Sequence, residues 1–335
     1  MSSPHCLGVI VTILALGSGF VGAQSPQPAV AVPTAEPARI EIWPLASTTM
    51  SDAAFLTGVT DGRATTLAAE LRLPSAATGR VPAVVILHGS TGASAAHDRW
   101  ARELNALGIA TLLIDSFTGR GLTTTAEDQS RLGEMAMVFD AYRALEMLAK
   151  HPRIDPARIG LFGNSRGGVG ALYASLDRFQ RMHGPRDAAF AVYVSLYPPC
   201  TRQYIDDAAV AKRPIRIFHG TDDVIAPIER CRAYVKRLKT AGADAQLIEY
   251  EGAHHGFDGH LLPPVSGPLP GGRAVGCELY EQPAGEFMNR ATGQPSTRSD
   301  PCWKGARITG YHAGAHGKVV ENVKQLLRQV FRVGP

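Results

Sequence analysis

The feature that most constrains the fold is a repeated alternation of short apolar segments with longer amphipathic ones. The apolar segments are rich in β-branched residues, as buried strands are: residues 81–89, 109–117, 158–165, 190–198, 214–223 and 245–255. Residues 65–74 alternate like an edge strand, and apolar side chains within residues 127–151 recur at helical spacing. Strands alternating with helices predict an α/β fold, a mostly parallel sheet with helices on both faces.

The first 38 residues are expected to lie outside this domain. Residues 1–23 have the features of a signal peptide, with a 15-residue apolar segment and then small residues that a signal peptidase recognises. Because no Lys or Arg precedes that segment, a non-cleaved anchor is the alternative. Residues 24–38 hold four prolines and predict an extended linker, which leaves residues 39–335 as one domain.

The composition excludes several classes of partner. A hydrophobic fraction of 45% is sufficient for a core, and the net charge of +4 is spread along the chain, so we expect no nucleic-acid partner. The apolar segment near the N-terminus is too short to span a bilayer well, so we expect no stable membrane span once it is removed. Gly17, Gly19 and Gly22 match a nucleotide-binding spacing, but no strand precedes them, so no nucleotide cofactor is expected.

Four cysteines remain after the signal peptide: Cys200, Cys231, Cys277 and Cys302. Four cysteines in an exported chain favour two disulfides, for which three pairings exist. Cys200 follows a predicted strand and Cys231 lies in the helix after the next one, which favours Cys200–Cys231. Cys277 and Cys302 share an irregular Gly- and Pro-rich insertion at about residues 258–316, which favours Cys277–Cys302.

Polar residues follow the predicted strands in an order typical of one kind of hydrolase. Ser165 stands in the segment GNSRGG, where glycines two residues away on each side are typical of a nucleophile on a sharp strand-to-helix turn. The pair Asp222 and Asp223 ends a later strand, and the pair His254 and His255 ends the one after it. The order Ser, Asp, His at the carboxyl ends of parallel strands predicts a Ser-His-Asp triad.

Five segments in this region give the chain a resemblance to the dienelactone hydrolase-like α/β-hydrolases: LHGSTG, LLIDSFTGRG, HPRIDPARIGLFGNSRGG, HGTDDVIAP and YEGAHHGFD. The resemblance covers residues 81–258 and the final helix. It implies an α/β-hydrolase fold with the nucleophile at the position of Ser165. The family's namesake enzymes carry a cysteine there, so the serine points to an esterase and away from the namesake lactone substrate.

The resemblance also selects one member of each adjacent pair. The family's acid lies three residues after a glycine and four before a proline, and Gly220 and Pro227 select Asp223. Its base stands two residues after an alanine and two before a phenylalanine, which selects His255. Adjacent side chains on an extended segment point to opposite sides, so only one of each pair is expected to serve.

The oxyanion of an acyl-transfer intermediate needs two backbone N–H donors. In this fold one belongs to the residue after the nucleophile, Arg166, and the other comes from the loop after the strand at 81–89. We expect Ser90 to supply it, with Thr91 as the alternative.

Other polar residues have a structural interpretation beside the functional one. His88 is expected to brace a loop, and Asp115 to be a hydrogen-bonded structural carboxylate more readily than a second acid. Arg120 and Arg166 are candidates for contact with an anionic substrate group, although a structural role fits at least as well. His312 and His316 form H-x-x-x-H, but the glycines around them disfavour a helix, so no metal site is expected.

The sequence therefore predicts an exported hydrolase, periplasmic or secreted, that cleaves small-molecule carboxylic esters through an acyl-serine intermediate. The predicted catalytic residues are Ser165, Asp223 and His255, and no metal or organic cofactor is expected. The alternatives are a peptidase of the same fold and a binding protein with a hydrolase fold and no turnover.

Overall fold

The structure is a computed structural model that describes residues 1, 37–59, 61–75, 79–265, 276–297, 299–303 and 308–334. Apart from Met1, the expected signal peptide at residues 1–23 lies outside the described residues, and so does the expected linker up to residue 36. Within the described ranges, no helix is both long and apolar enough to cross a membrane.

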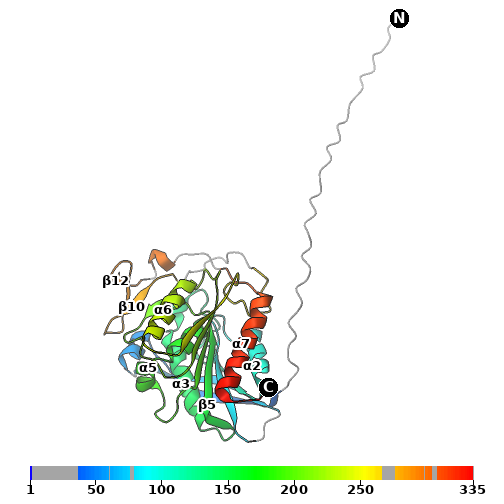
Figure 1. The fold of residues 1–335 in the computed structure, drawn as a ribbon. Coiled ribbons are helices and arrows are strands. Elements are labelled where there is room, and N and C mark those ends of the chain that lie inside the picture. The colour runs from blue at the N-terminus through cyan, green and yellow to red at the C-terminus, as the bar shows by residue number, and fades with distance from the viewer. Residues whose placement is uncertain are drawn as a thin grey trace.

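An eight-stranded sheet forms the centre of the domain (Figure 1), with its strands in the order β1-β2-β4-β3-β5-β6-β8-β9. These strands are β1 (Pro37–Thr49), β2 (Arg63–Pro74), β3 (Val81–Leu87), β4 (Ala110–Asp115), β5 (Ile154–Asn164), β6 (Val192–Leu196), β8 (Ile215–Gly220) and β9 (Ala245–Tyr250). The strands from β4 to β9 in this order pair in parallel, whereas β1 and β2 pair antiparallel at one edge. The prediction of a mostly parallel α/β sheet is confirmed.

Strand β1 was not predicted from the sequence pattern. It pairs with β2 along its whole length, and β2 pairs on its other side with β4. The expectation that residues 65–74 form an edge strand is therefore wrong, since β1 occupies the edge. The alternation in β2 has a different cause, because Leu67, Ala69, Leu71 and Leu73 pack into the core while the other face stays more exposed.

Helices cover both faces of the sheet (Figure 1), and each face has its own apolar cluster. The helices are α1 (Asp52–Thr57), α2 (Ala95–Asn105), α3 (Met135–Ala149), α4 (Arg166–Tyr173), α5 (Asp177–His183), α6 (Ile228–Thr240) and α7 (Ala313–Phe331). Residues of α2 and α7 pack on one face, and residues of the other five helices pack on the opposite face. The fully buried strand β3 contributes alternate side chains to the two clusters, as its apolar sequence predicts.

A second, small sheet contains three short strands of the insertion and one strand from outside it. Its strands lie in the order β12-β11-β10-β7. They are β7 (Arg202–Gln203), β10 (Leu279–Glu281), β11 (Phe287–Asn289) and β12 (Gln294–Pro295). Because each strand has only two or three residues, the sequence of this region has no period that predicts a strand.

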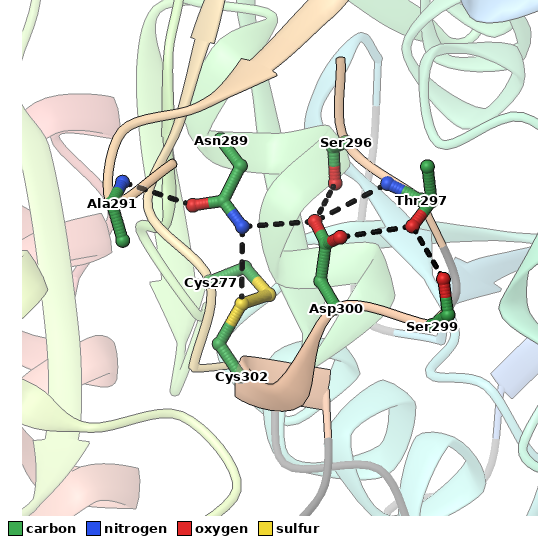
Figure 2. The surroundings of a disulfide bond; sticks show 8 residues. All are labelled: Cys277, Asn289, Ala291, Ser296, Thr297, Ser299, Asp300 and Cys302. Atoms are coloured by element: carbon green, nitrogen blue, oxygen red, sulfur yellow. Dashed lines mark hydrogen bonds between the residues drawn. A yellow bond between two sulfur atoms is a disulfide. The ribbon is translucent and has the colours of Figure 1, made fainter. Parts of the chain in front are cut away.

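Both disulfides are present in the structure. One joins Cys200 to Cys231, with 5.1 Å between their Cα atoms, and the other joins Cys277 to Cys302, with 4.9 Å. Figure 2 shows that the second bond lies beside a cluster of polar side chains, in which Asp300 accepts hydrogen bonds from Asn289 at 2.8 Å and from the Thr297 hydroxyl at 2.8 Å. The bond and this cluster together hold the small sheet to the 3₁₀ turn η3 (Pro301–Trp303).

Helix α7 begins earlier than the sequence pattern indicates. The glycines around His312 and His316 disfavour a helix, yet α7 starts at Ala313. The Nδ1 atom of His312 accepts a hydrogen bond from the backbone N–H of Ala315 at 3.1 Å, so this histidine caps the helix. His316 lies in the first turns of α7 and is buried, and burial lowers its pKa to about 4.

Candidate active site

Ser165 occupies the sharp turn between β5 and α4. Its backbone has φ 53° and ψ −116°, a conformation that residues other than glycine rarely adopt. Gly163 and Gly167 make the turn possible, because a Cβ on Gly163 would overlap the carbonyl of Gly167 and a Cβ on Gly167 would overlap the carbonyl of Leu87. The turn aims the Ser165 hydroxyl away from the helix and toward the loops at the carboxyl ends of the strands.

His255 and Asp223 lie within hydrogen-bond reach of this serine in one continuous chain. The Nε2 atom of His255 is 2.8 Å from Ser165 Oγ, and its Nδ1 atom is 2.7 Å from Asp223 Oδ2. The other oxygen of Asp223 accepts hydrogen bonds from the backbone N–H groups of Ile225 at 2.9 Å and Ala226 at 2.8 Å. Because an ionised carboxylate only accepts, the His255 proton lies on Nδ1 and Nε2 is free to accept the serine proton.

The neighbouring residues of each pair are turned away from the serine. Asp222 is exposed, and its side chain accepts a hydrogen bond from the Thr221 hydroxyl at 2.9 Å. The Nδ1 atom of His254 lies 2.9 Å from the backbone oxygen of Asp222. Thus the structure brings Ser165, Asp223 and His255 together and leaves Asp222 and His254 outside the chain of hydrogen bonds.

The residues of the two predicted oxyanion donors, Arg166 and Ser90, line the same cavity as Ser165. The backbone N–H of Arg166 starts α4, so it has no partner within the helix. Ser90 follows β3, and its carbonyl accepts hydrogen bonds from the N–H of Thr125 at 2.8 Å and the hydroxyl of Thr124 at 3.0 Å. These bonds fix the loop that carries the N–H of Ser90, and Thr91 stands next to it in the same cavity.

The guanidinium of Arg166 forms hydrogen bonds within the protein. It donates to the Gln129 side chain at 2.8 Å, to the Gln129 carbonyl at 3.2 Å and to the Leu132 carbonyl. Burial lowers its pKa to about 10, which leaves it charged at neutral pH. Its side chain therefore braces residues 129–132 against α4.

Arg120, His88 and Asp115 have structural partners. The buried Arg120 guanidinium forms two hydrogen bonds with the buried Asp140 carboxylate, at 2.7 and 2.8 Å. His88 donates from Nδ1 to the Gly89 carbonyl at 2.8 Å and accepts at Nε2 from the Ser116 N–H at 3.1 Å, and burial lowers its pKa to about 4. Asp115 accepts from the N–H groups of Phe117 and Thr118, so it closes a turn.

The triad opens into a cavity of about 850 Å³, which is within the range that binds a small organic ligand. One wall comes from the loops of the main sheet and includes Ser90, Thr91, Ser165, Arg166, Ile225 and His255. The facing wall includes apolar residues of the small sheet, η3 and the loop after His255: Leu261, Leu262, Leu279, Phe287 and Trp303. The individual residues of this wall carry no signal in the sequence that predicts them.

The described residues contain one group of side chains with metal-ligand spacing, Cys277, Asp300 and Cys302. Both sulfur atoms are joined in a disulfide, so neither is a thiolate that could bind a metal ion. His312 and His316 have structural positions, because His312 caps α7 and His316 is a buried residue of that helix.

Comparison with known proteins gives the same fold. A crystal structure of a dienelactone hydrolase-like promiscuous phosphotriesterase from metagenomic libraries aligns with a TM-score of 0.55 and 16% identity, over 87% of this chain and 99% of that one. A thermophilic esterase from Thermogutta terrifontis with bound propionate aligns with a TM-score of 0.53 and 17% identity, over 87% of this chain and 97% of that one.

Curated relatives cover smaller parts of the chain. An uncharacterized protein of Mycobacterium tuberculosis is 28% identical over 165 residues, which are 46% of this chain and 57% of that protein. The chain thus spans little more than half the length of that relative. A "Probable 2-oxo-3-(5-oxofuran-2-ylidene)propanoate lactonase" of Bradyrhizobium sp is 25% identical over 199 residues, 55% of this chain and 76% of that protein.

The sequence profile of the Dienelactone hydrolase family matches residues 67–263, a stretch that runs from β2 to the loop after His255. The match covers more than half of the chain and includes the serine turn, the acid and the histidine. The chain belongs to the dienelactone hydrolase family and has the α/β-hydrolase fold.

Proposed function

We propose that the protein is an exported serine hydrolase that cleaves carboxylic esters through an acyl-serine intermediate. The observation that carries the proposal is the continuous hydrogen-bond chain from Ser165 Oγ through His255 to Asp223, at 2.8 and 2.7 Å. A serine hydroxyl becomes a useful nucleophile only when a base takes its proton, and this chain supplies the base and the acid that orients it.

The reaction follows from these positions. Ser165 Oγ attacks the ester carbonyl carbon while His255 Nε2 takes the hydroxyl proton, and Asp223 stabilises the imidazolium that results. The proton then passes from Nε2 to the leaving alkoxide, the C–O bond to the alcohol breaks, and the acyl group stays on Ser165. A water molecule, deprotonated by the same Nε2, attacks the acyl carbon. The bond from that carbon to Ser165 Oγ breaks, Nε2 returns the proton to Oγ, and the acid leaves.

The backbone N–H groups of Arg166 and Ser90 are the proposed oxyanion donors. Both belong to segments held by hydrogen bonds to the rest of the protein, so they need not reorganise as negative charge develops on the carbonyl oxygen. Losing one such donor costs about 10²–10³ in kcat in well-studied cases.

The proposed location follows from the disulfides, and the proposed substrate class follows from the relatives and the cavity. Two disulfides support an oxidising compartment and therefore export, with residues 1–23 as the proposed signal peptide, residues 24–38 as the proposed linker and residues 39–335 as the proposed mature domain. The relatives support ester bonds as substrates, since one is named an esterase and another a lactonase, and a lactone is a cyclic ester. The apolar wall of the cavity supports an ester with an apolar acyl or alcohol group.

A fluorophosphonate probe tests this proposal against a hydrolase-fold protein without turnover. We expect the wild-type protein to gain one covalent phosphonyl group, located at Ser165 by peptide mass mapping, because the activated hydroxyl displaces the fluoride. The matched control is Ser165→Ala, which should not react. Wild-type protein that stays unlabelled, or that is labelled equally in the variant, would overturn the proposal.

A further inference from the structure

We propose that the buried hydrogen bond between Tyr197 and Asp258 is a positioning device that keeps the nucleophile turn and the histidine loop in register. The inference rests on the proposed function, because the two parts it joins carry Ser165 and His255. Neither Tyr197 nor Asp258 is a member of the triad, yet both side chains line the cavity and are almost fully buried.

Tyr197 lies at the centre of the site in a costly backbone conformation. It follows β6 and has φ 38°, in the left-handed region where bulky residues are rare. The carbonyl of the preceding residue, Leu196, accepts the backbone N–H of Ser165 at 2.9 Å. The Tyr197 ring also packs edge-on against the His255 imidazole, with 4.8 Å between ring centroids. Strain of this kind persists only where surrounding contacts hold it, and it gathers at functional sites.

Asp258 ties the histidine loop to this tyrosine. It stands three residues after His255, and its Oδ1 atom accepts the Tyr197 hydroxyl proton at 2.5 Å. Its Oδ2 atom accepts the indole N–H of Trp100 on α2 at 2.7 Å. Both carboxylate oxygens thus have buried donors, and charge-assisted bonds of this kind are about twice as strong as neutral ones.

The chain of hydrogen bonds continues to the nucleophile and the oxyanion loop. The Tyr197 oxygen accepts from the side-chain amide of Asn164, the residue before Ser165, at 3.3 Å. Asn164 Oδ1 accepts from His97 Nε2 at 2.8 Å, and His97 Nδ1 accepts from the backbone N–H of Ser94 at 3.0 Å. A single network therefore contacts the loop that carries Ser90, the turn that carries Ser165 and the loop that carries His255.

This arrangement suits positioning and not direct catalysis. The Tyr197 hydroxyl already donates to Asp258 and accepts from Asn164, so its donor is not available to a substrate. If the bond to Asp258 is lost, the histidine loop keeps its fold but gains freedom relative to Ser165. Because proton transfer depends steeply on the Ser165–His255 geometry, the turnover rate should fall while substrate binding stays the same.

The test is Tyr197→Phe, which removes the hydroxyl and keeps the ring against His255. The matched control is Tyr234→Phe on α6, which removes another buried tyrosine hydroxyl that donates to a backbone carbonyl, Asp207, at 2.8 Å. For each variant we would measure the thermal midpoint, the fraction of sites that react with a fluorophosphonate, and kcat and KM per reactive site on a short aryl ester.

We expect Tyr197→Phe to lower kcat per reactive site about 10- to 100-fold with KM within about twofold, and Tyr234→Phe to leave kcat unchanged at a similar thermal midpoint. Asp258→Asn, which retains one acceptor oxygen, should lose less, and its effect should not add to that of Tyr197→Phe. A kcat per site in Tyr197→Phe equal to that of Tyr234→Phe would overturn the positioning role alone. Wild-type protein that neither turns over nor reacts would overturn this inference together with the proposed function.

Discussion

The main sheet and the small sheet are built by opposite means. Strands β3, β5, β6 and β8 are rich in buried apolar residues, and Ser165, Asp223 and His255 each follow a strand of the same sheet. The strands of the small sheet have two or three residues, and the sheet depends on a disulfide and on hydrogen bonds around Asp300. In the main sheet, the order of the strands is enough to bring the reacting groups together. The small sheet, which also lines the cavity, is held in addition by the Cys277–Cys302 disulfide. We therefore expect changes in the first region to remove chemistry and changes in the second to alter stability and selectivity.

The largest difference in activity is expected between variants of Asp222 and Asp223, two adjacent residues in the loop after β8. Asp223→Asn should leave the fold intact and lower the rate about 10⁴-fold, because an amide holds His255 in the wrong tautomer. Asp222→Asn should have a small effect, because Asp222 is exposed and does not contact His255. The measurement is kcat/KM of both variants on one ester at neutral pH, with His255→Ala and His254→Ala as a second pair. A larger loss in Asp222→Asn or His254→Ala than in its neighbour would mean that the assignment is off by one residue.

The next contrast concerns the disulfide of the small sheet. Replacing Cys277 and Cys302 together by Ser should lower the free energy of unfolding by about 3 kcal/mol, since the bond closes a loop with a sequence separation of 25 residues. Its effect on kcat for a small acetate ester should stay within about twofold, because no triad residue lies in this region. Denaturant unfolding and steady-state kinetics measure the two quantities. A loss of turnover as large as that of Asp223→Asn would end the proposed separation of roles between the two regions.

The region of the main sheet is expected to have a pH-dependent free energy of unfolding, because His88, which follows β3, is buried. His88 is fully buried with a pKa of about 4, whereas the unfolded imidazole titrates at 6.5. The unfolded state therefore binds the proton first on acidification, so stability is lost as the pH falls from 6.5 to about 4, by about 3 kcal/mol for this group. Protonation would also place a proton on Nε2 against the N–H of Ser116.

Denaturant unfolding at several pH values between 7 and 4, in wild type and His88→Asn, measures this contribution. The slope of stability against pH should be smaller in His88→Asn than in the wild type. Equal slopes in wild type and His88→Asn would show that His88 does not contribute.

The smallest expected effect is on selectivity. Phe287 on β11 lines the cavity opposite the triad, so Phe287→Ala removes apolar contact area from the bound substrate without touching the reacting groups. We expect kcat/KM for long-chain or aryl esters to fall about tenfold and that for acetate esters to change less than twofold. A panel of esters of graded acyl length measures this, with a lactone included. A uniform loss across the panel would place Phe287 in the chemistry and not in selectivity.

Much of the main sheet could be predicted from the sequence, because short apolar segments that alternate with amphipathic helices are typical of strands covered on both faces. Strand β1 escaped prediction because its first residues, including Pro37, were assigned to the linker, although prolines are tolerated in an edge strand. For the same reason β2 was taken for the edge. The start of α7 escaped because His312 supplies a cap that compensates for the glycines after it.

Some residues of the candidate site could be predicted from the sequence and others could not. Ser165, Asp223 and His255 could be named from their positions after strands, because the parallel topology brings strand ends together. Tyr197, Asp258 and the apolar residues of the small sheet could not, because their importance arises from contacts between segments far apart in the sequence. Only Tyr197 has a local anomaly, its positive φ, and that appears in the structure alone.

The central claim is that Ser165 carries the acyl group during turnover, and trapping that intermediate tests it most directly. Wild-type protein would be mixed with an excess of an aryl ester, quenched in acid within the first turnovers, digested and mapped by mass spectrometry. The account predicts one acyl group on the peptide that contains Ser165, and in Ser165→Ala no acyl-enzyme and a rate lower by about 10⁴- to 10⁶-fold. An acyl group on another residue, or rapid hydrolysis by Ser165→Ala, would contradict it.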